Sequence, residues 1–273
     1  MASSDSFRQA VYREYMSFFE LAEKNRRWNP FCDVPWDELD PSTFCPKAAL
    51  NAETFVGVES YLPDYVSQGI NCVRSMFGQA WFSANWGYEE SKHALVLREY
   101  LVRSGQRSEQ EMFDYEKAIL ANQWKMPFET ARQMTFYGAI QELATFMMYK
   151  HQRDLARGRN DKVLEKIYGF IARDEAAHAD FYRKVTMLEI EDDREGCIRD
   201  IALVFKNFRM PGTDLVPDYG QRTERMRDTG GVDRGVFLKE VWFPTLKKLG
   251  VSRHEVTRAL TKLRQEQTRN RAA

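Results

Sequence analysis

Two short segments of the sequence combine a carboxylate and an imidazole at the same spacing. Glu90 precedes His93 by three residues in YEESKHAL, and Glu175 precedes His178 by three residues in RDEAAHADF. Residues three apart on an α-helix lie on one face, so each segment offers an oxygen and a nitrogen ligand side by side. A single pair of this kind is more often an exposed surface pair, but the chain has only four histidines and two of them stand here. The two pairs together predict a metal site between helices.

Such a site needs further carboxylates, which helical geometry locates. Four-helix bundles that bind two iron ions use two Glu-x-x-His helices and one glutamate from each of two other helices. Ligands at the same height on antiparallel helices are separated by a turn near their midpoint. Between Glu142 and Glu175 that midpoint falls on residues 156–161, ARGRND, which is a plausible helix stop and restart. A candidate Glu59 stands in a similar relation to Glu90, although the turn between them is less clear. The sequence thus predicts two helical hairpins.

The remaining elements fit a single all-α domain that spans the whole chain. Residues 1–47 are expected to form an amphipathic helix, at 5–26, followed by a proline-rich extended segment. Residues 48–206 show helical spacing of apolar residues and are predicted to form the bundle, with a crossover connection and its own helix in the interval 105–127. Residues 207–273 read as a loop rich in glycine, proline and charge, followed by one or two closing helices.

Composition narrows the classes of function. The chain has 40 basic and 40 acidic residues, so no overall charge favours nucleic acid or a membrane surface. No run of about 18 apolar residues occurs, and the N-terminus lacks an apolar signal core. The four cysteines form no CxxC motif, which is typical of reduced thiols. We therefore expect a cytoplasmic protein that binds neither nucleic acid nor membrane.

Three further residues are placed near the predicted ligands by helical spacing. Trp86 lies one turn before the first Glu-x-x-His pair and shares its face. Asp174 directly precedes Glu175 and is expected to hold an imidazole of the other hairpin, as carboxylates commonly do for metal-bound histidines. Thr145 lies one turn after Glu142, with its hydroxyl toward the metals. A purely structural role remains open for each of the three.

Four segments, in their order along the chain, carry a resemblance to a known family. The runs WGYEESKHALVLREYL, QELATF, RDEAAHADFY and FRMPGTDLVPDY resemble the soluble acyl-acyl-carrier-protein desaturases, and the resemblance extends from about Trp28 to the C-terminal helices. It implies a ferritin-like four-helix di-iron bundle with additional N-terminal, crossover and C-terminal helices, and two iron ions (Fe2+/Fe3+) per chain. Matched to the family's motifs, the iron ligands are Glu59, Glu90, His93, Glu142, Glu175 and His178, and the outer tryptophan, outer aspartate and oxygen-side threonine are Trp86, Asp174 and Thr145.

The resemblance also implies a reaction and partners. Such a protein uses O2 and electrons from a ferredoxin-type donor to introduce a cis double bond into an acyl chain carried on acyl carrier protein, and it forms a homodimer. Thr145 is hypothesised either to pass protons or to steady the peroxide during this reaction. Because acyl carrier protein is strongly acidic, docking requires a basic patch, for which Lys24, Arg26 and Arg27 are the candidates.

Departures from the family keep other reactions open. Leu143 stands where relatives often have an arginine, and the turn at 210–213 reads MPGT rather than MPGH or MPAH. A di-iron hydroxylase or N-oxygenase acting on a carrier-bound or small natural-product substrate is the alternative. Arylamine N-oxygenases typically add a histidine near the second motif, whereas Ile171 occupies that position here. Glu59 disfavours a ribonucleotide reductase small subunit, whose first ligand is an aspartate, and an iron-storage bundle lacks the N-terminal segment.

Overall fold

The computed structural model describes residues 4–213, 215–227 and 233–272, and within these ranges it contains helices and no β-strand. In chain order the α-helices are α1 (Asp5–Asn25), α2 (Pro46–Glu59), α3 (Leu62–Val73), α4 (Phe77–Arg103), α5 (Glu109–Leu120), α6 (Ala131–Gly158), α7 (Lys162–Asp192), α8 (Arg194–Asn207), α9 (Tyr219–Arg227), α10 (Arg234–Val236), α11 (Phe243–Lys248) and α12 (Arg253–Ala272). A π-helical turn, Phe237–Trp242, joins α10 to α11. The all-α prediction is confirmed.

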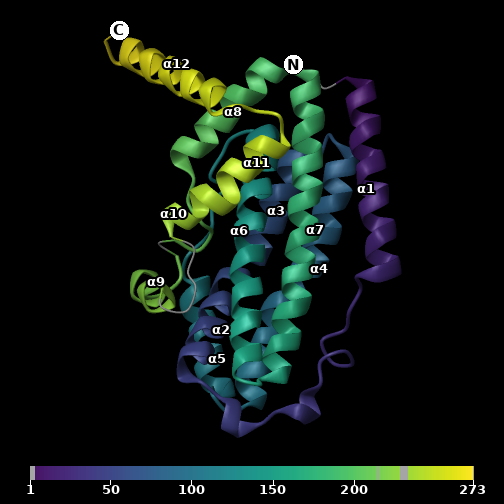
Figure 1. Cartoon of the computed structure of the whole chain (residues 1–273), viewed down its shortest axis with the longest axis vertical. Helices are drawn as coiled ribbons and strands as arrows, with labels where there is room; N and C mark the ends of the chain where they lie inside the picture. The colour runs from purple at the N-terminus through teal and green to yellow at the C-terminus, as the bar shows by residue number, and fades with distance from the viewer. Residues whose placement is uncertain (1–3, 214, 228–232, 273) are drawn as a thin grey trace.

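Three long helices, α4, α6 and α7, run side by side along the length of the molecule, and α2 followed by α3 completes the bundle (Figure 1). The turn predicted at 156–161 is present, because α6 ends at Gly158 and α7 begins at Lys162. Asp161 starts α7 by accepting a hydrogen bond from the Leu164 amide. The first hairpin is less regular, since α2 stops at Glu59 and the chain restarts as α3 with Pro63 in its first turn.

The N-terminal helix α1 packs against α4 and α7 along the outside of the bundle (Figure 1). Its buried side chains follow helical spacing and are Val11, Tyr15, Phe18 and Ala22. At the end of the helix, Arg26 contacts Glu89 and Asp174, which adjoin the Glu-x-x-His segments. The proline-rich segment then descends past the lower end of the bundle (Figure 1). This path brings the residues at the end of α1 into the interior near the ligands.

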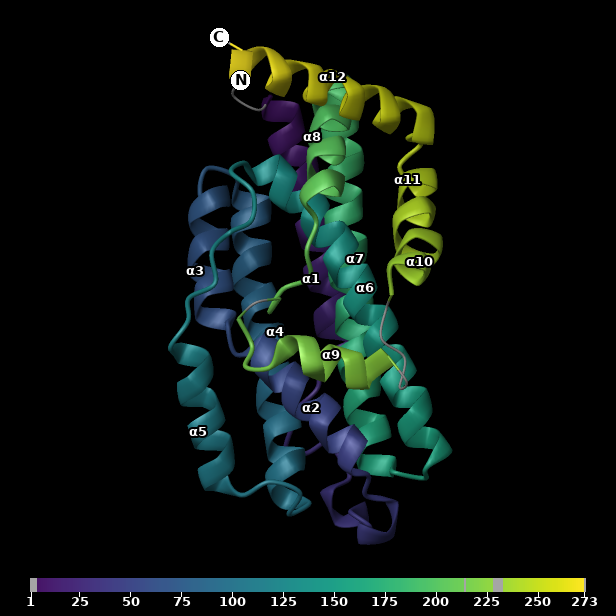
Figure 2. The ribbon, with the colours of Figure 1, turned by 90° about the vertical axis from the view of Figure 1, so that its left-hand side faces the viewer.

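The crossover prediction is confirmed by α5, which begins with a capping box between Ser108 and Glu111. The prediction of a plain loop after residue 207 is wrong in one part, because α9 forms there and contacts α2. The break between α7 and α8 at Asp193 was also not predicted. At the other end of the bundle, α12 lies across α8 (Figure 2).

No helix in the described part of the chain is both long and apolar enough to cross a membrane. All four cysteines are free, and only Cys197 is buried. The expectation of reduced thiols is consistent with this arrangement.

Candidate metal centre

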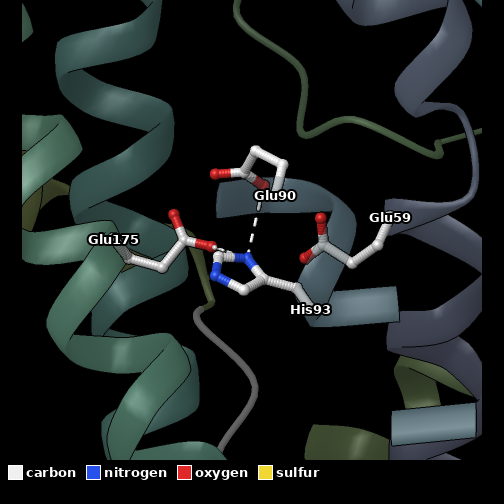
Figure 3. A group of neighbouring side chains, drawn as sticks. All are labelled: Glu59, Glu90, His93 and Glu175. Atoms are coloured by element: carbon white, nitrogen blue, oxygen red, sulfur yellow. Dashed lines mark ion pairs between the residues drawn. The ribbon is translucent and has the colours of Figure 1, made fainter. Parts of the chain in front are cut away.

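The structure brings all six predicted ligands together inside the bundle. Glu59 comes from the end of α2, Glu142 from α6, and one Glu-x-x-His pair from each of α4 and α7. All six side chains are buried. They form two overlapping groups, in each of which one ligand atom per residue lies within 4.8 Å of the others: Glu59, Glu90, His93 and Glu175, drawn in Figure 3, and Glu90, Glu142, Glu175 and His178.

Two carboxylates, Glu90 and Glu175, belong to both groups and lie between them. The Nδ1 atom of His93 is 3.3 Å from Glu90 Oε2 and 3.4 Å from Glu175 Oε1, as the dashed lines in Figure 3 indicate. On the other side, His178 Nδ1 is 2.9 Å from Glu90 Oε1. Each group therefore has one imidazole, one carboxylate of its own and two shared carboxylates. This is the arrangement of two adjacent metal positions bridged by two carboxylates.

The outer nitrogen of each imidazole faces a carboxylate supplied by the opposite hairpin. His93 Nε2 lies 3.5 Å from Asp174 Oδ2, and His178 Nε2 lies 2.8 Å from Glu89 Oε2. These contacts leave both Nδ1 atoms directed into the cluster and orient the rings for metal binding. The structure thus places Asp174 where the sequence analysis expected it. The sequence analysis did not identify Glu89, although this acid directly before Glu90 repeats the pattern of Asp174 before Glu175.

A buried guanidinium joins the two outer carboxylates. Arg26, which caps the end of α1, places its Nη1 atom 2.9 Å from Glu89 Oε2 and 2.9 Å from Asp174 Oδ1. Asp174 also accepts a 2.7 Å hydrogen bond from the Trp28 indole. Glu89 is further held by Arg27, whose Nη1 atom is 2.5 Å from Glu89 Oε1. The supports of both imidazoles are therefore linked through one residue of the N-terminal helix.

This geometry corrects the predicted carrier-docking patch. Arg26 is only 8% exposed and its charge is directed inward, so it is not available to a docked protein. Arg27 is partly exposed but is paired with Glu89 and Glu23. Lys24 alone of the three is well exposed, and it pairs with Glu20 on its own helix. Two of the three cations, Arg26 and Arg27, therefore pair with the carboxylates beside the candidate ligands, whereas Lys24 stays on the surface.

Unsatisfied atoms within the cluster indicate that a cation fits it. Four buried ligand atoms lack a hydrogen-bond partner among the described residues, and they are Glu90 Oε1, His93 Nδ1, Glu175 Oε2 and His178 Nδ1. Buried polar atoms in native proteins are rarely left without partners, and metal ions are one way to satisfy them. Carboxylate oxygens and imidazole nitrogens form a donor set suited to iron. The residues present match a pair of metal ions.

In the metal-free cluster, most of the ligand side chains have raised pKa values, which favours their protonated forms. Burial and the negative charge of Glu90 raise the pKa of Glu59 to about 8. Burial likewise raises the pKa of Glu175 well above its usual range. For His93 and His178 burial acts to lower the pKa, but the surrounding carboxylates outweigh it and raise both values. Burial opposes ionisation of Glu90, yet the imidazoles hold its pKa at about 2. Protons supply the positive charge that metal ions provide in a loaded site.

These shifts predict how the stability of the metal-free protein depends on pH. Folded-state pKa values above the unfolded values mean that folding takes up protons, so we expect the melting temperature of chelator-treated protein to fall between about pH 6 and about pH 9. The Glu90 shift acts at lower pH and does not offset this trend. Differential scanning calorimetry across this range tests it. The Glu59→Gln variant should show a shallower fall, and a melting temperature that rises with pH would contradict the prediction.

A long cavity runs along the bundle from the carboxylates. Its wall includes Glu142 and Thr145 of α6 at one end, and on α4 it extends from Glu90 back to Gln79, a distance of about 16 Å at the rise of an α-helix. The indole of Trp86 lines the cavity and donates a 3.2 Å hydrogen bond to Glu142 Oε1. Thr145 is 8% exposed and lies on the wall, with its hydroxyl bonded to the Gln141 carbonyl. The candidate ligands Glu59, Glu90, Glu142 and Glu175 thus form part of the wall of this cavity.

Gly138 of α6 lies directly against the ring of Tyr182 of α7 beside this cavity. A Cβ atom at this position would lie 2.8 Å from the ring of Tyr182 on α7. We expect Gly138→Ala to cost about 1–3 kcal/mol in the free energy of unfolding, because the buried ring must move. Urea denaturation measures the cost. Gly158→Ala is the control, since a Cβ at that helix end meets nothing within 4 Å. Equal stability of the two variants would contradict the prediction.

Comparison with known proteins places this geometry in a family. The family model described as fatty acid desaturase matches residues 58–271. DesA1 of Mycobacterium tuberculosis, whose name places it among the acyl-[acyl-carrier-protein] desaturases, is 27% identical over 269 residues, covering 89% of this chain and 77% of DesA1. Stearoyl-[acyl-carrier-protein] 9-desaturase 6 of Arabidopsis thaliana is 30% identical over 208 residues, covering 67% of this chain and 53% of that protein.

Among solved structures, the X-ray structure of DesA2 from Mycobacterium tuberculosis has a similar fold. It superposes with a TM-score of 0.67 at 16% identity, covering 94% of this chain and all of that chain. At this identity the likeness establishes the ferritin-like fold alone. The family model, which spans most of the sequence, establishes the relationship. The chain belongs to the fatty acid desaturase family of oxidoreductases.

Proposed function

We propose that this protein is a di-iron, O2-dependent desaturase that introduces a cis double bond into an acyl chain carried on acyl carrier protein. One observation carries the proposal, namely two overlapping ligand groups that share Glu90 and Glu175 beside a long cavity. The names of the relatives support acyl carrier protein as the carrier. Glu59, Glu142 and the two histidines would complete the two iron positions.

Two bound iron ions would supply the activation of O2. The overall reaction removes two hydrogens from adjacent methylene groups. Together with two electrons and two protons from outside, they reduce one O2 to two waters, and the electrons require a reduced donor such as a ferredoxin-type protein. The protein fixes the chain in the cavity, so that adjacent methylenes lie beside the carboxylates.

Several side chains have roles in this scheme that follow from their contacts. Asp174 and Glu89 keep the two imidazoles turned toward the iron positions, and Trp86 fixes the carboxylate of Glu142. The hydroxyl of Thr145 lies on the cavity wall one turn from Glu142 and donates to the Gln141 carbonyl, and its proposed role is to pass protons to the site after that bond is exchanged. Aromatic rings around the cavity exclude water from the reacting chain.

A second cavity offers an entrance for the carrier-bound chain. It adjoins the first, because both are lined by Phe55, Val58, Met148, Met210 and Tyr219. Its rim carries exposed cations from α8, α10 and α12, namely Lys206, Arg234 and Arg264, and one exposed acid, Asp233. We propose this rim as the docking surface for the acidic carrier, in place of the cluster at the end of α1.

The docking proposal predicts a salt-dependent kinetic effect. Reversing both charges with Arg234→Glu and Arg264→Glu should raise the Michaelis constant for acyl carrier protein by about tenfold at low ionic strength, and by less as salt screens the charges. The turnover number should change little. Arg258→Glu, an exposed arginine elsewhere on α12, is the matched control. An unchanged Michaelis constant at low salt would remove the rim from the docking surface.

The function itself is tested by iron content and a single turnover. We expect about two irons per chain after anaerobic reconstitution, and an acyl product lighter by two hydrogens when reduced protein meets O2 and acyl carrier proteins of different chain length. A product that gains oxygen would establish hydroxylation or N-oxygenation instead. Oxidation of iron with no change in any acyl chain would indicate iron storage. Protein that binds no iron would refute the di-iron proposal.

A further inference from the structure

The end of the long cavity farthest from the carboxylates is polar. Gln79 and Ser83 of α4 line it opposite Thr135 of α6, and all three side chains are at least nine-tenths buried. Phe82 also lines this end, and the section nearer the carboxylates is lined by the aromatic side chains of Trp86 and Tyr182. A fully apolar acyl chain has no use for amide and hydroxyl groups at its tip. The polar end of the cavity therefore indicates that the substrate has a polar group on the part of its chain that reaches it.

The hydrogen bonds at this end leave one acceptor unused. Thr135 Oγ1 donates its single proton to the Ala131 carbonyl at 2.8 Å, so it must accept from the Gln79 amide nitrogen, which lies 2.8 Å away. The Gln79 side-chain oxygen then has no partner among the described residues. Ser83 donates to the Gln79 backbone carbonyl and does not satisfy it.

A second unsatisfied group stands behind the first. Glu189 of α7 interacts with the Thr135 side chain, and its Oε2 atom is buried without a hydrogen-bond partner. Burial raises the pKa of this carboxyl well above its usual range. If an acyl chain placed its terminal methyl group beside Gln79, it would seal the Gln79 oxygen from water without offering a hydrogen bond. A hydroxyl group on the chain would donate that hydrogen bond.

We propose that the substrate carries a hydroxyl group on the part of its chain that reaches Gln79 and Thr135. The inference rests on the proposed function, because it assumes that an acyl chain enters past the basic rim and passes the carboxylates. The hydroxyl lies about 10–16 Å beyond the reacting carbons, as measured along α6 from Glu142 to Thr135 and along α4 from Glu90 to Gln79. It donates to the Gln79 oxygen, and the substrate class is therefore a hydroxyacyl chain on a carrier.

Binding to the iron-loaded protein tests the proposal in the absence of an electron donor, so that nothing turns over. The probes are acyl carrier proteins loaded with straight acyl chains and with their counterparts hydroxylated at the terminal carbon, compared length by length. At the length that reaches Gln79 we expect the hydroxylated chain to bind about tenfold more tightly, since a polar site discriminates against a ligand that leaves it unpaired. Equal dissociation constants at every length would overturn the proposal.

Variants test whether the preference for the hydroxylated chain arises from the polar end of the cavity. Gln79→Leu should abolish the preference for the hydroxylated chain, and Thr135→Val, which keeps the side-chain shape, should weaken it. Gln110→Leu on the exposed face of α5 is the control and should leave the preference intact. A preference that survives in both cavity variants would overturn the assignment. If neither kind of acyl carrier protein binds, the proposed function fails as well, whereas equal binding of both overturns only the hydroxyl group.

Discussion

Replacing Glu175 by glutamine is expected to empty both metal positions at once. The glutamine keeps the volume of the side chain but removes the charge of a carboxylate that belongs to both ligand groups. Iron content should fall from about two ions per chain to near zero, because each position loses an anionic oxygen ligand. Desaturation should be lost with it. Elemental analysis after reconstitution measures the iron directly.

Two matched variants make this result specific to a shared ligand. Glu59→Gln changes a carboxylate that belongs to only one group, so the protein should keep about one ion. Glu191→Gln alters an exposed glutamate near the end of the same helix as Glu175 and should keep both. Full iron content in Glu175→Gln would show that the carboxylate does not bridge. Loss of both ions in Glu59→Gln would show that the positions do not bind separately.

Arg26→Met should be the most destabilising change outside the ligands. It leaves the buried carboxylates of Glu89 and Asp174 without the cation that bonds both. Removing one partner of a buried ion pair costs about 3–5 kcal/mol, which urea denaturation of the metal-free protein can measure. Iron affinity should also fall, by about 10–100-fold, because the carboxylates that orient the imidazoles are no longer fixed.

The controls distinguish this role from a general effect of charge. Lys24→Met removes an exposed cation from the same helix and should cost no more than about 1 kcal/mol. Arg26→Lys should be intermediate, since an ammonium lacks the planar fork of a guanidinium. Adding Glu89→Gln to Arg26→Met should recover part of the loss, because it removes one of the two buried carboxylate charges that Arg26 neutralises. If Arg26→Met were as stable as Lys24→Met, the residue would not support the metal centre.

The spacing of Glu and His was enough to predict the cluster, because a helix converts a three-residue interval into a shared face. The turn at 156–161 was equally readable, whereas the turn between Glu59 and Glu90 was less clear. The buried position of Arg26 could not be predicted, because its sequence neighbours Lys24 and Arg27 suggest an exposed basic cluster. Whether a charge at a helix end faces solvent or the interior depends on how α1 packs on α4 and α7, and local spacing carries no such information.

The second cavity and α9 were beyond prediction for a related reason. The segment after residue 207 is rich in glycine, proline and charge, which favours a loop, yet α9 forms where it can contact α2. Tertiary contacts of this kind override local propensity. Glu89 is a different case. The sequence does show an acid directly before each of the ligand glutamates Glu90 and Glu175, so this residue could have been predicted.

The crossed support of the imidazoles has a consequence for how the protein assembles. The histidine of each hairpin is held by an acid from the other, Asp174 for His93 and Glu89 for His178. Neither hairpin alone can therefore form an oriented ligand set, and the connection between them runs through the long crossover containing α5. The ligand set is complete only when segments distant in sequence have docked, a slow step in chain folding. Iron capture during biosynthesis should accordingly be a late event that reports on completed assembly.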